Sequence, residues 1–195
     1  CARLLKLMGA KKIVMVDRKG VLNKIRGDLN KYNQDLAVES KCNTLDEVMI
    51  DSDVFIGVSG ANLLSPSLIS TMNQNPIIFA LANPNPEILP DEAHAVRDDI
   101  VMATGRSDFP NQVNNVLGFP FLFRGALDAK AKEINNDMLI AAAIALANLA
   151  KEDVPQLVLD AYGVKSMSFG KEYFIPKPFD PRLIDRVAKA VREAA

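Results

Sequence analysis

The 195-residue sequence contains no tryptophan, a single histidine and only two cysteines, Cys1 and Cys42. Neither cysteine lies in a Cys-x-x-Cys motif or in a Cys/His spacing typical of metal ligands, so we expect no disulfide framework. Unpaired cysteines and the absence of a signal-peptide pattern predict a reducing, cytoplasmic environment. The lone His94 lies beside Asp91 and Glu92 on a predicted exposed helix, and we expect it to be solvated rather than catalytic.

Long hydrophobic runs and a strong charge imbalance are also absent. The longest apolar segment, residues 138–149, is rich in alanine and too short for a membrane span, which favours a buried helix. The 23 lysines and arginines nearly balance the 24 acidic residues, giving a net charge of −1. Such a chain has no general attraction to nucleic acid or anionic membranes. We therefore predict a globular domain whose partners are neither nucleic acid nor membrane.

Apolar segments of strand type alternate with helix-type segments along the first half of the chain. The predicted strands cover residues 12–16, 53–58, 76–82 and 100–105, and the helices between and before them cover 2–8, 44–50, 65–72 and 90–96. Continuously apolar strands are typical of parallel sheets buried on both faces. The pattern predicts an α/β fold with a Rossmann-like, doubly wound, mainly parallel sheet and flanking helices. Further helices are predicted over 119–131, 136–150, 154–162 and 181–193.

Small and polar residues follow the predicted strands at the point where each strand ends. Asp17 follows the first strand, the turn Ser59-Gly60-Ala61 follows the second, and Asn83 follows the third, before Pro84. The carboxyl ends of parallel strands meet at one edge of a sheet, where α/β proteins bind ligands. A carboxylate at the position of Asp17 would accept hydrogen bonds from the ribose hydroxyls of a dinucleotide.

Four amide side chains, Asn111, Gln112, Asn114 and Asn115, are concentrated after the fourth predicted strand. An amide inside a protein needs partners for two donors and an acceptor. The cluster therefore predicts either helix-capping and turn chemistry or a polar ligand site, and the residues alone leave both interpretations open.

Four stretches carry a resemblance to a known family. They are Gly-Val-Ser-Gly-Ala-Asn-Leu-Leu-Ser at 57–65, Phe-Ala-Leu-Ala-Asn-Pro-Asn-Pro-Glu at 79–87, the amide-rich stretch 105–128, and Tyr-Phe-Ile-Pro-Lys-Pro-Phe-Asp-Pro-Arg at 173–182. In this order they resemble the dinucleotide-binding domain of a malic enzyme over nearly the whole chain. The resemblance implies that residues 1–195 are a fragment forming the C-terminal part of that domain, with helices 119–195 packing on it. The first strand and the glycine-rich loop would then lie upstream.

The resemblance implies oxidative decarboxylation of malate to pyruvate and carbon dioxide, with hydride transfer to NAD(P). It assigns cofactor binding to Asp17, Ser59, Gly60, Ala61, Asn83 and Asn115, and substrate binding to Asn83, Asn114 and Asn115. No catalytic or metal-binding residue is expected in this fragment, and a divalent Mg or Mn ion would be bound by residues outside it. The implied partners are malate and pyruvate, the rest of the enzyme chain, and further copies in a homo-oligomer.

The choice between NAD and NADP is open, and we predict NAD. The carboxylate of Asp17 accepts from a ribose 2′-hydroxyl but repels a 2′-phosphate. Against this stand the basic residues Arg18, Lys19, Lys24 and Arg26, which are suited to a phosphate. Two alternative functions also remain: the cofactor domain of an amino-acid dehydrogenase, and a non-catalytic nucleotide-binding module.

Overall fold

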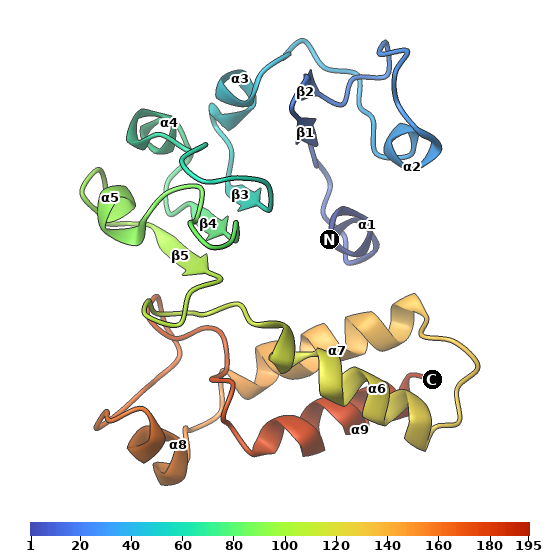
Figure 1. Ribbon diagram of the computed structural model, residues 1–195, viewed down its shortest axis with the longest axis vertical. Coiled ribbons are helices and arrows are strands. Elements are labelled where there is room, and N and C mark those ends of the chain that lie inside the picture. Colours follow the sequence, from blue (N-terminus) through green and yellow to red (C-terminus); the bar gives the residue numbers. More distant parts are fainter.

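The chain folds around two separate apolar cores in the computed structural model, which describes residues 1–195 (Figure 1). The first core lies between a three-stranded parallel sheet and three short helices. The sheet has the order β3-β4-β5. Its strands are β3 (Val54–Gly57), β4 (Ile77–Ala80) and β5 (Val101–Thr104), and its helices are α3 (Leu45–Met49), α4 (Pro66–Ser70) and α5 (Pro90–His94).

Local signals in the sequence begin the three helices. The Thr44 hydroxyl accepts from the backbone N–H of Glu47 while the Glu47 carboxylate accepts from the N–H of Thr44, the reciprocal capping box that the sequence predicts. Pro66 and Pro90 occupy the first turns of α4 and α5, where the missing N–H costs nothing. The predicted alternation of strands and helices from residue 44 to residue 105 is therefore confirmed.

The central strand β4 divides its side chains between the two faces of the sheet. Ile78 and Ala80 are fully buried in the core with the helices. Ile77 and Phe79 lie on the opposite face and are half-buried, and the Phe79 ring is in edge contact with Phe174 from the C-terminal segment. The C-terminal segment thus covers part of this second face.

The prediction of a strand over residues 12–16 in the parallel sheet is wrong. The chain instead forms a hairpin in which β1 (Val16–Asp17) pairs antiparallel with β2 (Gly20–Val21), outside the three-stranded sheet. The backbone N–H of Lys19 donates to the Asp17 side chain, and Gly20 adopts the left-handed conformation with φ +105°. These features reverse the chain directly after Asp17. The helix α1 (Ala2–Leu7) precedes the hairpin, and α2 (Lys31–Gln34) follows it.

The second core is a helical layer that lies below the sheet in Figure 1. Its elements are the 3-10 helix η1 (Asn115–Leu117), then α6 (Phe119–Asp128), α7 (Asn136–Leu149), α8 (Gln156–Ala161), the π-helical turn η2 (Ile184–Ala188) and α9 (Lys189–Glu193). The helices α6, α7 and α9 lie side by side and enclose Met138, Leu149, Val187 and Val191. None of the helices combines the length and the apolar character needed to cross a bilayer.

Candidate functional site

The three parallel strands end in line at one edge of the sheet. Gly57 is paired in register with Ala80, and Ala80 with Thr104. Three loops leave this edge, which we name the β3 loop (residues 58–64), the β4 loop (81–87) and the β5 loop (105–114). The predicted convergence of strand ends is confirmed for these three strands, whereas Asp17 ends a strand of the separate hairpin.

The β3 loop and the β4 loop are joined through Glu87. Its carboxylate is fully buried and accepts hydrogen bonds from the backbone N–H of Ser59 (3.1 Å) and of Ala82 (3.0 Å). The main chain of the β4 loop adds two further bonds, because Asn62 N–H donates to the Pro86 carbonyl and Leu64 N–H donates to the Glu87 carbonyl. The two loops therefore form one hydrogen-bonded unit.

This unit brings together Ser59, Gly60, Ala61 and Asn83. Ser59, Ala61 and Asn83 are exposed, and Gly60 is half-buried. The hydroxyl of Ser59 and the amide of Asn83 form no hydrogen bond within the chain, although many other polar side chains do. A group of small residues beside two free polar side chains allows a ligand to approach the backbone closely and still find hydrogen-bonding partners.

Asn111 serves the fold rather than a ligand. Its side chain is 1% exposed, donates to the carbonyls of Met102 (3.1 Å) and Lys171 (2.6 Å), and accepts from the N–H of Phe174 (2.9 Å). Its backbone is left-handed, with φ 55°, which asparagine tolerates better than most residues. The Asn111 amide thus ties the β5 loop to strand β5 through Met102 and to residues 171–174 through the other two bonds.

The remaining amides of the cluster lie nearer the surface. The Asn114 side-chain oxygen accepts from Val116 N–H at 3.1 Å and caps η1, so its NH₂ group stays free. Asn115 is exposed and its side chain forms no hydrogen bond. Gln112 donates to the carbonyl of Gly105 at 3.4 Å. The capping use is therefore seen at Asn114, and the ligand-binding use predicted for Asn114 and Asn115 stays a prediction.

Asp17 is not a free carboxylate. Arg26 binds both of its oxygens, at 2.9 and 3.0 Å, and the same guanidinium also binds both oxygens of Asp28. Lys19 completes the network with an ion pair to Asp28 at 2.7 Å. Hydrogen bonds from Arg26 lower the pKa of Asp17 below its ordinary value, and they lower that of Asp28 much further. Both carboxylates therefore stay charged throughout the ordinary pH range.

Comparison with known proteins identifies the family of this chain. The sequence matches the family described as "Malic enzyme, NAD binding domain" over residues 5–161. It is 53% identical to an NADP-dependent malic enzyme of Halomonas elongata and 46% identical to an NAD-dependent malic enzyme of Rhizobium meliloti, in each case over its whole length. The chain belongs to the malic enzyme NAD-binding domain family.

The chain spans only part of these malic enzymes, 47% of the Halomonas protein and 26% of the Rhizobium protein. A crystal structure of the NAD-dependent malic enzyme of Thermotoga maritima matches the whole chain with a TM-score of 0.84 and 36% identity. The chain covers 48% of that structure. The predicted resemblance to malic enzymes is therefore confirmed.

Sequence reasoning missed Glu87 and the pairing of Arg26 with Asp17. Glu87 closes the motif Ala-Asn-Pro-Asn-Pro-Glu, but nothing local indicates that its carboxylate is buried. The basic character of Arg26 suits a phosphate, and a separation of nine residues in the sequence gives no local signal of its contact with Asp17. No group of three or more His, Cys, Asp or Glu residues in the chain is arranged to hold a metal ion.

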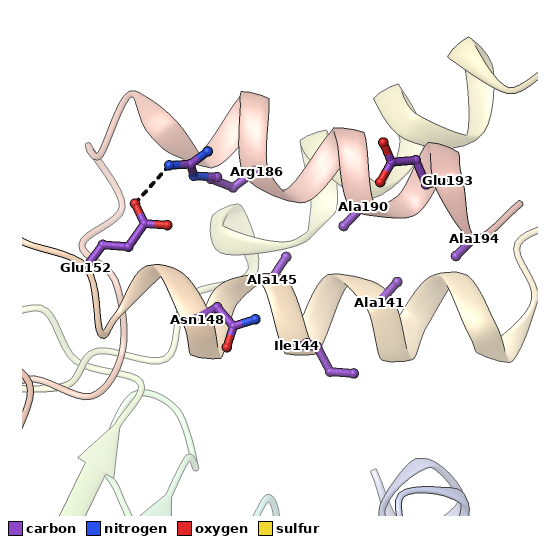
Figure 2. Close-up of a pocket in the computed structure, with 9 residues that line it drawn as sticks. All are labelled: Ala141, Ile144, Ala145, Asn148, Glu152, Arg186, Ala190, Glu193 and Ala194. Carbon is purple, nitrogen blue, oxygen red and sulfur yellow. Dashed lines mark hydrogen bonds and ion pairs between the residues drawn. The ribbon is translucent and has the colours of Figure 1, made fainter.

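A surface hollow lies away from the strand ends, between α7 and the η2–α9 helix (Figure 2). Alanines from both helices form much of its lining. An ion pair between Arg186 and Glu152, at 3.0 Å, closes one end. This hollow is wide open to solvent, whereas small-molecule sites bury most of the ligand surface, so it lacks the character of a substrate site.

Proposed function

We propose that the protein containing this chain catalyses the oxidative decarboxylation of malate to pyruvate and carbon dioxide, with hydride transfer to NAD(P). This chain would supply the cofactor-binding domain. The observation that carries the proposal is the β3–β4 loop unit, which presents free Ser59 and Asn83 side chains at the carboxyl edge of a parallel sheet in a chain of this family. The bound cofactor supplies the hydride acceptor.

The roles of the site residues follow from their placement. Ser59, Gly60 and Ala61 would contact the cofactor through short side chains and backbone, and Asn83 would contribute its amide to cofactor and substrate. Asn114 and Asn115 follow the third strand end, since Val113 N–H donates to the Thr104 carbonyl at 2.8 Å. Their free NH₂ groups are suited to a malate carboxylate, and that of Asn115 also to the cofactor.

In place of the NAD predicted from the sequence, we propose NADP as the cofactor. Free Asp17 was the physical reason to favour NAD, because it would repel a 2′-phosphate. Its pairing with Arg26 offsets that charge. The hairpin region carries three cations, Arg18, Lys19 and Arg26, against the carboxylates of Asp17 and Asp28. The exposed Arg18 guanidinium would be free to bind the phosphate, and Asp17 would act on the adenosine ribose together with Arg26.

The metal and the acid–base groups would come from outside this chain, whose residues do not fit a divalent-metal site. We further propose that residues 1–195 belong to one dinucleotide-binding domain on which helices 119–195 pack. In the complete enzyme, its three-stranded sheet would be part of a doubly wound Rossmann-like sheet. Assembly as a homo-oligomer remains part of the same proposal.

The test is turnover by the full-length enzyme. Purified enzyme with malate, NADP and Mg²⁺ or Mn²⁺ should form equal amounts of pyruvate and reduced cofactor, and a chelator should abolish both. Cofactor reduction with amino acids but not with malate would favour an amino-acid dehydrogenase. Binding of NADP in equilibrium dialysis without turnover of malate would favour a non-catalytic module. A protein limited to residues 1–195 should form no pyruvate.

A further inference from the structure

Glu87 is a buried carboxylate with no cationic partner. Its side chain lies at the base of the β3–β4 loop unit and is 0% exposed. No lysine, arginine or histidine forms an ion pair with it, whereas the other fully buried carboxylate, Asp180, is bound through both oxygens by Arg182 at 3.0 and 2.8 Å. Burying an anion without a cation is costly unless hydrogen bonds replace its hydration.

The hydrogen bonds to Glu87 come from two different loops. One carboxylate oxygen accepts from Ser59 N–H in the β3 loop, and the other accepts from Ala82 N–H in the β4 loop. Ser59 and Asn83, the free polar side chains of the candidate site, are therefore at or next to the two residues that donate. A shift of this carboxylate would move both.

Gly57 leaves the space that this carboxylate occupies. A Cβ atom built on Gly57 would overlap the Glu87 side chain at its Cδ, Oε1 and Cγ atoms. Gly57 does not adopt the left-handed conformation, so the requirement for glycine here is one of space rather than backbone freedom. The last residue of β3 and the last residue of the β4 loop are thus fitted to each other.

We propose that Glu87 is a positioning residue for the cofactor, which sets the relative placement of the β3 and β4 loops through the N–H groups of Ser59 and Ala82. The inference rests on the proposed function, in which these two loops bind the dinucleotide. Glu87 acts through backbone groups and does not touch the reacting atoms. Its length and its two acceptor oxygens are both required, since each oxygen serves a different loop.

Two conservative substitutions in the full-length enzyme separate these requirements. Glu87→Gln keeps the length but turns an NH₂ donor toward one of the two N–H groups, and Glu87→Asp keeps the charge but shortens the reach. Each should weaken binding of the reduced cofactor, measured by fluorescence titration without malate, by about tenfold through the loss of one hydrogen bond to a charged group. The turnover number at saturating cofactor and malate should change by less than about threefold, because positioning is restored when the site is filled.

Asp180→Asn provides the matched control. It removes the charge of an equally buried carboxylate that contacts Arg182 and lies outside the loops of the site. This variant should lower the denaturation midpoint and leave cofactor affinity at the wild-type value. An equal loss of affinity in Asp180→Asn and Glu87→Gln would overturn the proposal, because general loosening of the fold would then explain both.

Gly57→Ala keeps the proposal testable without changing Glu87, and a double-mutant cycle with Glu87→Ala tests the contact itself. The added methyl group should displace the Glu87 carboxylate and weaken cofactor binding in the wild-type background. It should cost much less in Glu87→Ala, where the space is vacant. Additive effects of the two substitutions would contradict the proposed contact.

The remaining outcomes separate this inference from the function on which it rests. Suppose that Glu87→Gln and Glu87→Asp both lower the denaturation midpoint but bind the cofactor as tightly as wild type. That result would overturn the positioning role of Glu87 and would not affect the proposed reaction with malate. If the wild-type enzyme binds the reduced cofactor without forming pyruvate, the proposed reaction fails. The titrations then still decide the role of Glu87, because they require no turnover.

Discussion

The amide of Asn111 donates a hydrogen bond of 2.6 Å to the backbone carbonyl of Lys171, 60 residues further along the chain. The same side chain accepts from the N–H of Phe174, whose ring contacts Phe79 on the face of the sheet opposite the three helices. Lys171 in turn donates to the carbonyl of Asp98, before β5. One asparagine thus fastens the segment between α8 and η2 to the sheet and the β5 loop.

Replacement of Asn111 by alanine should destabilise the protein by about 2–4 kcal/mol, since it leaves several buried backbone groups without partners. Alanine also disfavours the left-handed backbone at this position. Asn111→Gly relieves that backbone strain while losing the same hydrogen bonds, so it should be less destabilising than alanine. Urea denaturation of the three proteins gives the comparison, and equal stability of Asn111→Ala and wild type would contradict the role assigned here.

The contact between α6 and α9 predicts a second stability effect. A Cβ on Gly125 would lie 2.5 Å from the Ala188 carbonyl oxygen and 2.6 Å from the Val191 Cβ, so the two helices approach as closely as a glycine permits. Gly125→Ala should gain helix propensity but lose more through overpacking, with a net destabilisation of about 1–3 kcal/mol. Gly118→Ala adds a methyl group in open space and serves as the control. A thermal midpoint of Gly125→Ala at or above that of wild type would refute the close packing.

Acid should weaken the link between Arg97 and Asp99. Arg97 binds both Asp99 oxygens, at 2.6 and 2.7 Å, and Asn75 N–H also donates to Asp99. Arg97 further donates to the carbonyls of Ile69, in α4, and of Met72, just after it. Hydrogen bonds from Arg97, followed by that from Asn75, hold the pKa of Asp99 far below its ordinary value. The unfolded chain therefore takes up this proton first as the pH falls.

The stabilisation from Asp99 is complete above the unfolded carboxyl pKa of about 3.9 and is lost as the pH falls from there through the lower folded pKa. The urea midpoint of wild type should accordingly fall more steeply between about pH 4 and pH 2 than that of Asp99→Asn. Asp98→Asn, which removes the neighbouring carboxyl without breaking a side-chain hydrogen bond, controls for the loss of one charge. Parallel curves for wild type and Asp99→Asn would exclude this linkage.

Features set by neighbouring residues could be predicted from the sequence. The capping box at Thr44 and the proline-initiated helices at Pro66 and Pro90 depend on contacts within one helical turn, and all three form as expected. The apolar run at 12–16 was misleading, because an apolar run alone does not distinguish a parallel strand from one arm of a hairpin. The turn sequence from Asp17 to Gly20 held the local signal for the hairpin.

Features set by distant residues could not be predicted. Asn111 and Asn115 are the same residue type four positions apart, and only the segment around Lys171 makes one structural and leaves the other free. Glu87 resembles an ordinary surface glutamate until the fold places it against Gly57 and Ser59. The sequence therefore located the sheet edge at which the three strand-end loops meet, but not the side chains that hold these loops in place.

The hairpin network predicts how cofactor choice responds to mutation. Removing Arg26 frees the Asp17 carboxylate, which should then repel a 2′-phosphate and shift the ratio of kcat/KM for NADP over NAD toward NAD by about tenfold. Asp17→Ser removes the carboxylate and should shift the ratio toward NADP. Kinetics of wild type, Arg26→Gln and Asp17→Ser with both cofactors test this. Preference of the wild type for NAD would refute the proposed cofactor. Identical ratios in all three proteins would show that the 2′ group of the adenosine ribose does not bind near Asp17 and Arg26.

The surface amides allow the substrate assignment to be tested by comparing two adjacent residues. Asn115 has a free side chain, so Asn115→Ala removes only what that amide does for a ligand. Its loss should lower kcat/KM for malate by about tenfold to a hundredfold, the value of a hydrogen bond to a charged group.

Asn114 both caps η1 and carries a free NH₂ group. Asn114→Asp keeps the capping oxygen but replaces the donor by a charge that repels malate, whereas Asn114→Ser retains a capping hydroxyl without repulsion. Full-length Asn114→Asp should therefore lose more activity than Asn114→Ser, although both keep the cap and the fold, as circular dichroism should confirm. Wild-type kinetics in Asn115→Ala and in both Asn114 variants would show that Asn114 and Asn115 do not bind the substrate.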